Sequence, residues 1–118
     1  MQVHLVDGTY ELYRQHFGQA TRHSDPPPFA GTIGVLTSTI QLLQDGATHI
    51  GVATDHVIES FRNDLYDGYK TSEGMEPVLL EQIPILEDAL RAMGVTVWAM
   101  EKYEADDALA SAAAVACE

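Results

Sequence analysis

Short apolar runs alternate with longer helical patterns along this chain of 118 residues. Three runs, at residues 3–6, 49–54 and 95–98, have the length and apolar content of buried parallel strands. The segments between and after them, at residues 10–17, 32–43, 79–93 and 104–117, have the composition or the spacing of helices. Alternation of strands and helices predicts an α/β layer fold with a mostly parallel sheet.

The second and third helical segments carry apolar stripes. One stripe consists of Ile33, Leu36, Ile40 and Leu43, and the glycine at position 46 is a typical C-terminal stop. The other covers residues 79–93, and Pro84 inside it should kink the helix or divide it. Residues 18–30, with three consecutive prolines, have no periodicity and predict a flexible loop.

Composition and charge narrow the class of protein. The chain is 46% hydrophobic and 20% charged, which is typical of a globular domain and excludes low-complexity classes. It has no long apolar run and no basic leader, so we expect no membrane partner and a cytoplasmic location. Cys117 is the one cysteine, which excludes disulfide and zinc-ribbon frameworks. A net charge of -12 makes the chain by itself a poor nonspecific DNA binder.

Five acids stand at positions that a parallel sheet brings to one edge. Asp7 and Asp55 directly follow apolar strand patterns, and Glu104, Asp106 and Asp107 open the helix after the third strand. Ligands of such sheets bind beyond the carboxyl ends of the strands. Two carboxylates about 5 Å apart repel by roughly 3 kcal/mol at an effective dielectric of about 20, so such a cluster requires a cation or a shared proton.

Oxygen ligands of this kind suit Mg²⁺ or Mn²⁺ better than zinc. Each acid also has a structural alternative: Asp7 and Asp55 can cap turns or helices, and the three acids near residue 104 can complement a helix dipole. The joint placement after successive strands favours a metal site, and both interpretations remain open at this point.

The strings LVDGTYELYR, ATDH, FRNDLYDGYK, EPVLLEQIPILEDALRAMGV and YEADDALA closely resemble the N-terminal part of the bacterial 5′-to-3′ exonuclease family. That family includes the 5′ nuclease domain of DNA polymerase I and the flap endonucleases. The resemblance covers residues 3–114. It implies a PIN-like (resolvase-like) three-layer fold and cleavage of DNA at flaps or free 5′ ends, in replication and repair.

The resemblance also implies roles for matching residues. Asp7, Asp55, Glu104, Asp106 and Asp107 match the family's metal-site carboxylates, which imply two Mg²⁺ or Mn²⁺ ions in the complete domain. Lys70 matches a lysine that stabilises charge at the scissile phosphate, Arg62 a basic position of the same motif, and Tyr69 an aromatic near the 5′ nucleotide. Residues 67–77 then correspond to an arch-like loop.

The family's further aspartates and its duplex-binding helix-hairpin-helix element belong to segments after those matched here. We therefore expect residues 1–118 to be the N-terminal half of a nuclease domain, truncated at the C-terminus. Its partners would be the missing C-terminal half, in the same or a separate chain, and a second copy at an open sheet edge. Alone, the piece should bind metal weakly and have slow or no activity.

Three other functions compete with the nuclease. A catalytically silent interaction module fits the acidic surface and the open edge. A PIN-type ribonuclease shares the acidic cluster, although it would not be expected to carry FRNDLYDGYK. A haloacid-dehalogenase-like phosphatase is suggested by the DGT string at Asp7, but Leu5 stands where that chemistry needs its aspartate nucleophile.

Overall fold

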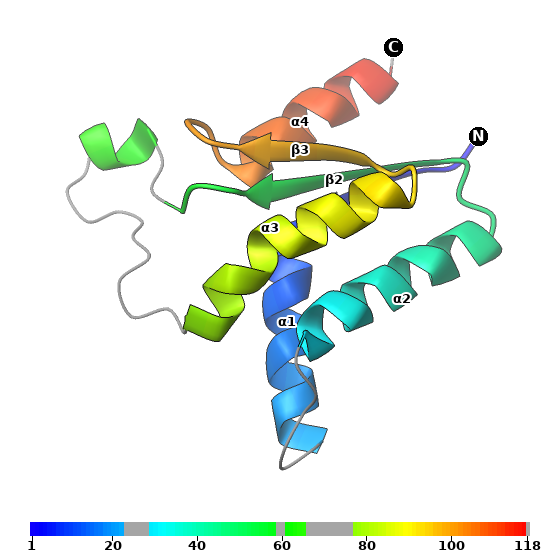
Figure 1. The fold of residues 1–118 in the computed structure, drawn as a ribbon. Helices are drawn as coiled ribbons and strands as arrows, with labels where there is room; N and C mark the ends of the chain where they lie inside the picture. The colour runs from blue at the N-terminus through cyan, green and yellow to red at the C-terminus, as the bar shows by residue number, and fades with distance from the viewer. Residues whose placement is uncertain (23–28, 59–60, 66–76, 118) are drawn as a thin grey trace.

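The computed structural model describes residues 1–22, 29–58, 61–65 and 77–117. Within them lie three strands, β1 (Val3–Asp7), β2 (His49–Asp55) and β3 (Thr96–Met100). The helices are α1 (Gly8–Arg22), α2 (Ala30–Gln44), α3 (Pro77–Ala92) and α4 (Ala105–Ala116), with a short 3-10 helix, η1 (Phe61–Asp64), after β2 (Figure 1).

The strands form one parallel sheet in the order β1-β2-β3. Asp7 pairs with Ala53 across the first strand pair, and Asp55 pairs with Met100 across the second. The carboxyl ends of the three strands therefore lie at one edge of the sheet, which Figure 1 shows on the side of η1. The predicted α/β class with a parallel sheet is confirmed.

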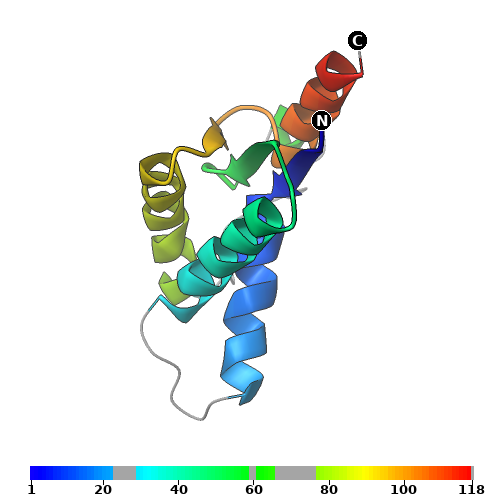
Figure 2. The same cartoon turned by 90° about the vertical axis from the view of Figure 1, so that its right-hand side faces the viewer.

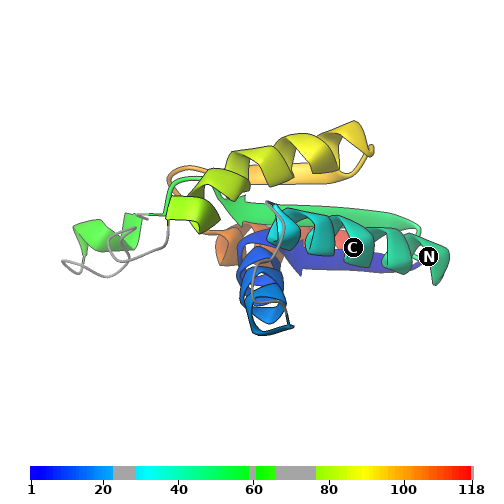
Figure 3. The same ribbon diagram turned by 60° about the horizontal axis from the view of Figure 1, so that its bottom comes forward.

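The helices make two layers around this sheet. Helices α1 and α3 pack on one face, with α2 lying against both of them, and α4 packs across all three strands (Figure 2). The view from below shows α4 behind the strands and the other helices in front (Figure 3). This is the expected three-layer α/β arrangement. Among the described residues, no helix has both the length and the apolar character needed to cross a membrane.

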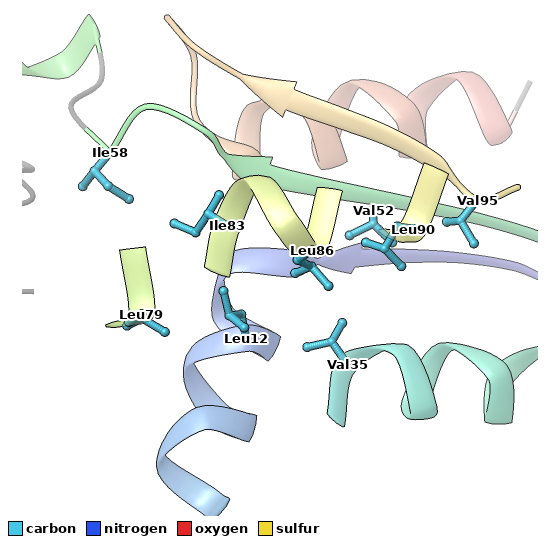
Figure 4. Packing of buried hydrophobic residues seen from close by; sticks show 9 residues of the cluster. All are labelled: Leu12, Val35, Val52, Ile58, Leu79, Ile83, Leu86, Leu90 and Val95. Atoms are coloured by element: carbon cyan, nitrogen blue, oxygen red, sulfur yellow. The ribbon is translucent and has the colours of Figure 1, made fainter. Parts of the chain in front are cut away.

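The hydrophobic core lies between the sheet and the layer formed by α1, α2 and α3. Apolar side chains from all these elements meet there (Figure 4), and they are Leu12, Val35, Val52, Ile58, Leu79, Ile83, Leu86, Leu90 and Val95. Since this core fills the space beneath β2, it fixes the central strand and the acid at its end.

The structure differs from the sequence pattern in α2. Its buried positions are Gly31, Thr32, Val35 and Thr39, whereas Ile33, Ile40 and Leu43 of the predicted stripe are exposed. A Cβ at Gly31 would lie 3.2 Å from Leu12 Cδ1, so the glycine permits close approach of α2 to α1. Gly31 thus faces the neighbouring helix, Leu36 packs partly against the core, and the other three residues of the stripe are exposed.

Two further boundaries differ. Helix α1 continues through Gly18 to Arg22, so the first part of the predicted loop at residues 18–30 is helical, and residues 23–28 lie outside the described residues. The expected arch-like loop at 67–77 falls almost wholly on residues 66–76, which are also outside them. Helix α3 is continuous and contains Pro84 at an exposed position, so the proline does not divide it.

Candidate functional site

Asp7 ends β1 and caps the helix that follows. Its Oδ1 accepts a hydrogen bond from the backbone N–H of Tyr10 at 3.1 Å, which satisfies one of the open donors at the start of α1. The side chain is half-buried at the carboxyl edge of the sheet. Asp7 therefore has the capping role expected as the structural alternative to a metal ligand. In this position it lies next to the end of β2.

Asp55 is the most enclosed acid of the predicted set, with 5% of its surface exposed. Its Oδ1 accepts a hydrogen bond from the backbone N–H of Ala105 at 3.0 Å, and its own N–H donates to Thr9 Oγ1 at 2.8 Å. These bonds join the end of β2 to the first turns of α4 and α1. Residues far apart in sequence thus meet at the carboxyl edge.

Glu104 and Asp107 form the start of α4. The N–H of Glu104 donates to Asp107 Oδ2 at 2.8 Å, as in a capping box, and Glu104 is 7% exposed. Asp106, in the same first turn, is exposed. The YEADD string therefore places two of its acids against the protein and one toward solvent.

Arg62, on η1, provides the positive charge next to these acids. Its guanidinium donates to both carboxylate oxygens of Asp107, at 3.0 and 3.1 Å, and to Glu104 Oε2. Such a fork is the geometry in which arginine binds carboxylates most strongly. The hydrogen bond to Asp107, together with that to Glu104, raises the pKa of Arg62 above its ordinary value. Arg62 therefore stays charged and partly neutralises the start of α4.

The predicted acids thus fall into an ordered arrangement along the edge. Asp55, Glu104 and Asp107 gather around the first turn of α4, Asp7 lies on the adjacent strand, and Asp106 faces solvent. Lys70 and Tyr69 lie outside the described residues. Within the described ranges, no three His, Cys, Asp or Glu side chains form a group that could hold a metal ion.

The chemistry of these donors nevertheless fits a hard divalent cation. Asp7, Asp55, Glu104 and Asp107 offer carboxylate oxygens, the ligands that Mg²⁺ and Mn²⁺ prefer. In this structure, Arg62 is bonded to carboxylate oxygens of Glu104 and Asp107. Binding of an ion by those two acids would therefore require Arg62 to move or to share them.

Sequence reasoning missed Glu87. This acid of α3 is buried, and its carboxylate binds Thr54 and His56, the residues on either side of Asp55. Its spacing was the available signal, since position 87 continues the buried series of Ile83 and Leu90 at helical intervals of four and three. An acid within an apolar stripe indicates a buried carboxylate that needs partners.

The layers of the fold and the acidic carboxyl edge together define a three-layer α/β domain with a parallel sheet. The chain belongs to a family described as "5'-3' exonuclease, N-terminal resolvase-like domain", which matches residues 2–118. The family predicted from the sequence motifs is thereby confirmed.

Curated relatives agree with this assignment. The chain is 32% identical to DNA polymerase I of Bacillus caldotenax over 113 residues, covering 93% of this chain and 13% of the polymerase. DNA polymerase I of Rhizobium leguminosarum is 32% identical over 118 residues, covering 91% of this chain and 12% of the polymerase. A 5'-3' exonuclease of Mycoplasma pneumoniae is 34% identical over 116 residues, covering 91% and 39%. The chain therefore spans well under half the length of each of these relatives.

Proposed function

We propose that this chain contributes the acidic half of a divalent-metal-dependent 5′-to-3′ nuclease that hydrolyses DNA phosphodiesters. The observation that carries the proposal is the meeting of two buried acids, Asp55 and Glu104, at the start of α4 on the carboxyl edge of the sheet. Buried carboxylates are costly unless a cation or hydrogen bonds compensate them. Family membership favours this reading over a phosphatase or a binding module.

In this proposal Asp7, Asp55 and Glu104 hold Mg²⁺ or Mn²⁺, and Asp106 and Asp107 contribute directly or through water. Such an ion, when bound, activates water and neutralises charge that develops on the phosphate. The chain's own acids keep their oxygens at the edge through backbone bonds: Asp55 through Ala105, and Asp7 through Tyr10. Two ions in the complete domain and activity on 5′ flaps are further parts of the proposal.

Arg62 has two roles in the proposal. Without an ion it compensates Glu104 and Asp107, and with substrate present the same fork is suited to a phosphate. Lys70 would add a compact charge at the scissile phosphate, and Tyr69 would stack near the 5′ nucleotide. These assignments rest on the motif FRNDLYDGYK and on the position of Arg62 at the edge.

The partners proposed are DNA with a free or flapped 5′ end and the remaining segments of a nuclease domain. The chain covers 39% of the Mycoplasma exonuclease, which supports a requirement for further segments. In the described sheet β1 and β3 are the edge strands, and either can accept an added strand from such a segment or from a second copy. Sedimentation of the chain alone, and together with a further segment of the nuclease domain, would show whether an edge strand pairs with a second copy or with that segment.

The test is a titration with Mn²⁺ of the wild-type chain and two variants. Asp55→Asn removes a buried acid of the edge, and Asp88→Asn removes an acid of α3 whose side chain is 82% exposed. We expect Mn²⁺ to raise the melting temperature of the wild type and of Asp88→Asn, because an ion bound only by the folded state stabilises it. Asp55→Asn should lose most of that increase.

Cleavage of a 5′-flap DNA provides the second measurement, with the protein carrying the downstream segments of its family. Asp55→Asn should abolish cleavage, whereas Asp88→Asn should cut as the wild type does. Equal Mn²⁺ responses in both variants would contradict the metal site. A wild-type protein that binds Mn²⁺ but cuts no flap or nicked DNA would instead support an interaction module.

A further inference from the structure

Glu87 is a buried acid that the proposed reaction does not use. Only 2% of its side chain is exposed, and its neighbours along the same face of α3 are the core residues Ile83, Leu86 and Leu90. Burying an ionised carboxylate costs several kcal/mol, and a hydrophobic residue in such a position is often as stabilising or more so. Packing alone therefore gives no reason for an acid here.

Both carboxylate oxygens of Glu87 hold the end of β2. Oε2 accepts a hydrogen bond from Thr54 Oγ1 at 2.5 Å, and Oε1 accepts one from His56 Nδ1 at 2.7 Å. Thr54 is buried, and 38% of the His56 side chain is exposed. Glu87 therefore binds the residue before Asp55 and the residue after it.

Asp55 itself is held from the other face of the sheet. Successive side chains of a strand point to opposite faces, so Thr54 faces α3 while Asp55 faces α4. There its Oδ1 accepts the bond from the Ala105 N–H. The end of β2 is thus fastened to α3 through its neighbours and to α4 through the acid.

We propose that Glu87 is a positioning residue for Asp55. By tying Thr54 and His56 to α3, it fixes the backbone on both sides of Asp55 and keeps that carboxylate directed at the first turn of α4. If Asp55 binds a metal ion, as in the proposed function, its carboxylate must be held to within about 0.5 Å, so the effect of Glu87 on metal binding rests on that function. Glu87 touches neither ion nor DNA in this role.

The first test needs no metal and follows the amide of Ala105 by NMR in Glu87→Leu, Glu87→Gln and Glu81→Leu. Glu81 is an exposed acid of the same helix and provides the matched control. In Glu87→Leu, the Ala105 amide resonance should shift and its hydrogen exchange should accelerate about tenfold, whereas Glu81→Leu should match the wild type. Glu87→Gln, which keeps the shape and one acceptor, should restore most of the protection.

An unchanged Ala105 amide in a folded Glu87→Leu chain would overturn the inference. If that variant does not fold, Thr54→Val takes its place, because it removes one of the two bonds to Glu87 while keeping nearly the same volume. Thr54→Val should show the same shift and acceleration at a smaller amplitude. An Ala105 amide that is unaffected in Thr54→Val would likewise overturn the inference.

The second test measures the affinity for Mn²⁺ in those of the same variants whose melting temperature without metal equals that of the wild type. Loss of groups that orient metal-binding side chains typically costs 10–100-fold in affinity, so Glu87→Leu should bind Mn²⁺ at least about tenfold more weakly. If Mn²⁺ binds and Asp55→Asn abolishes binding while Glu87→Leu does not weaken it, the positioning role fails and the metal site stands. If no Mn²⁺ binds but the Ala105 amide responds, the proposed function fails and the positioning role stands.

Discussion

Replacing Gly8 with alanine should loosen the carboxyl edge of the sheet. Gly8 is the first residue of α1, directly after Asp7, and it is buried. A Cβ at this position would lie 2.7 Å from Val52 Cγ1, 3.0 Å from Thr54 Cγ2 and 3.2 Å from the Ala53 carbonyl oxygen. Carbon atoms in good contact stay about 3.5–4.0 Å apart, so the start of α1 and strand β2 would have to separate.

The size of the effect follows from what surrounds the added methyl group. Val52 is a fully buried, branched side chain and the Ala53 oxygen belongs to the backbone, so neither can move aside freely. Overpacking of this kind costs about 1–3 kcal/mol, and alanine recovers at most about 1 kcal/mol through its helix preference. We expect a net loss of about 1–2 kcal/mol, or about 4–8 °C in melting temperature for a domain of this size.

Gly18→Ala provides the control within the same helix. Among the described residues, and apart from its chain neighbours and the backbone of its own helix, no atom lies within 4 Å of a Cβ at Gly18, so alanine there should stabilise the chain by up to about 1 kcal/mol. Urea unfolding of both variants and the wild type would measure the difference. A Gly8→Ala chain as stable as Gly18→Ala would refute the close approach of α1 to β2 on which the site geometry depends.

Arg62→Gln should bind Mn²⁺ more tightly than the wild type yet cleave DNA more slowly, because the guanidinium competes for acids of α4 and is suited to the phosphate. The hydrogen bond to Asp107 raises the pKa of Arg62, so the stabilisation by Arg62 is complete below the ordinary arginine pKa and is lost only above the raised pKa. The difference in melting temperature between the wild type and Arg62→Gln should therefore stay constant between about pH 7 and 10. Gln82→Leu should cost about 1–3 kcal/mol in urea unfolding, since it leaves Thr32 N–H without its acceptor at 3.1 Å. Leu86→Ala, in the centre of the core, should cost about 2–5 kcal/mol by the same measurement, and values below 1 kcal/mol would contradict these assignments.

The sequence predicts the strands and their parallel pairing because short apolar runs have few other uses in a domain of this size. Gly46 follows the end of α2 as expected, with a φ value of 107°, and Gly94 follows α3 with a φ value of 86°. The helix predicted from the apolar stripe is present as α2, but Ile33, Ile40 and Leu43 are exposed, because periodicity identifies a face without identifying its neighbour. Gly31, Thr32 and Thr39 are buried there together with Val35, and no hydrophobic pattern marks the glycine and the threonines as buried.

In the candidate site, too, some features can be predicted from the sequence and others cannot. Strand ends at Asp7 and Asp55 could be predicted from the sequence, since the edge of a parallel sheet follows from topology alone. The ion pairs of Arg62 could not, because they depend on where η1 lies relative to α4. Glu87 escaped notice because an acid on a helix is ordinarily solvated, and its burial becomes evident only once β2 is placed against α3.

In the described sheet, each strand lies beside the one that precedes it in the chain. During synthesis, each of these strands can therefore pair with the strand synthesised before it, and no formed strand pair has to separate for a later strand to insert. The first strand pair and its helices can assemble while the rest of the chain is still in the exit tunnel. The hydrogen bond from the Ala105 N–H to Asp55 can form only after residue 105 has been synthesised, so the acidic edge acquires this contact late in the synthesis of the residues described.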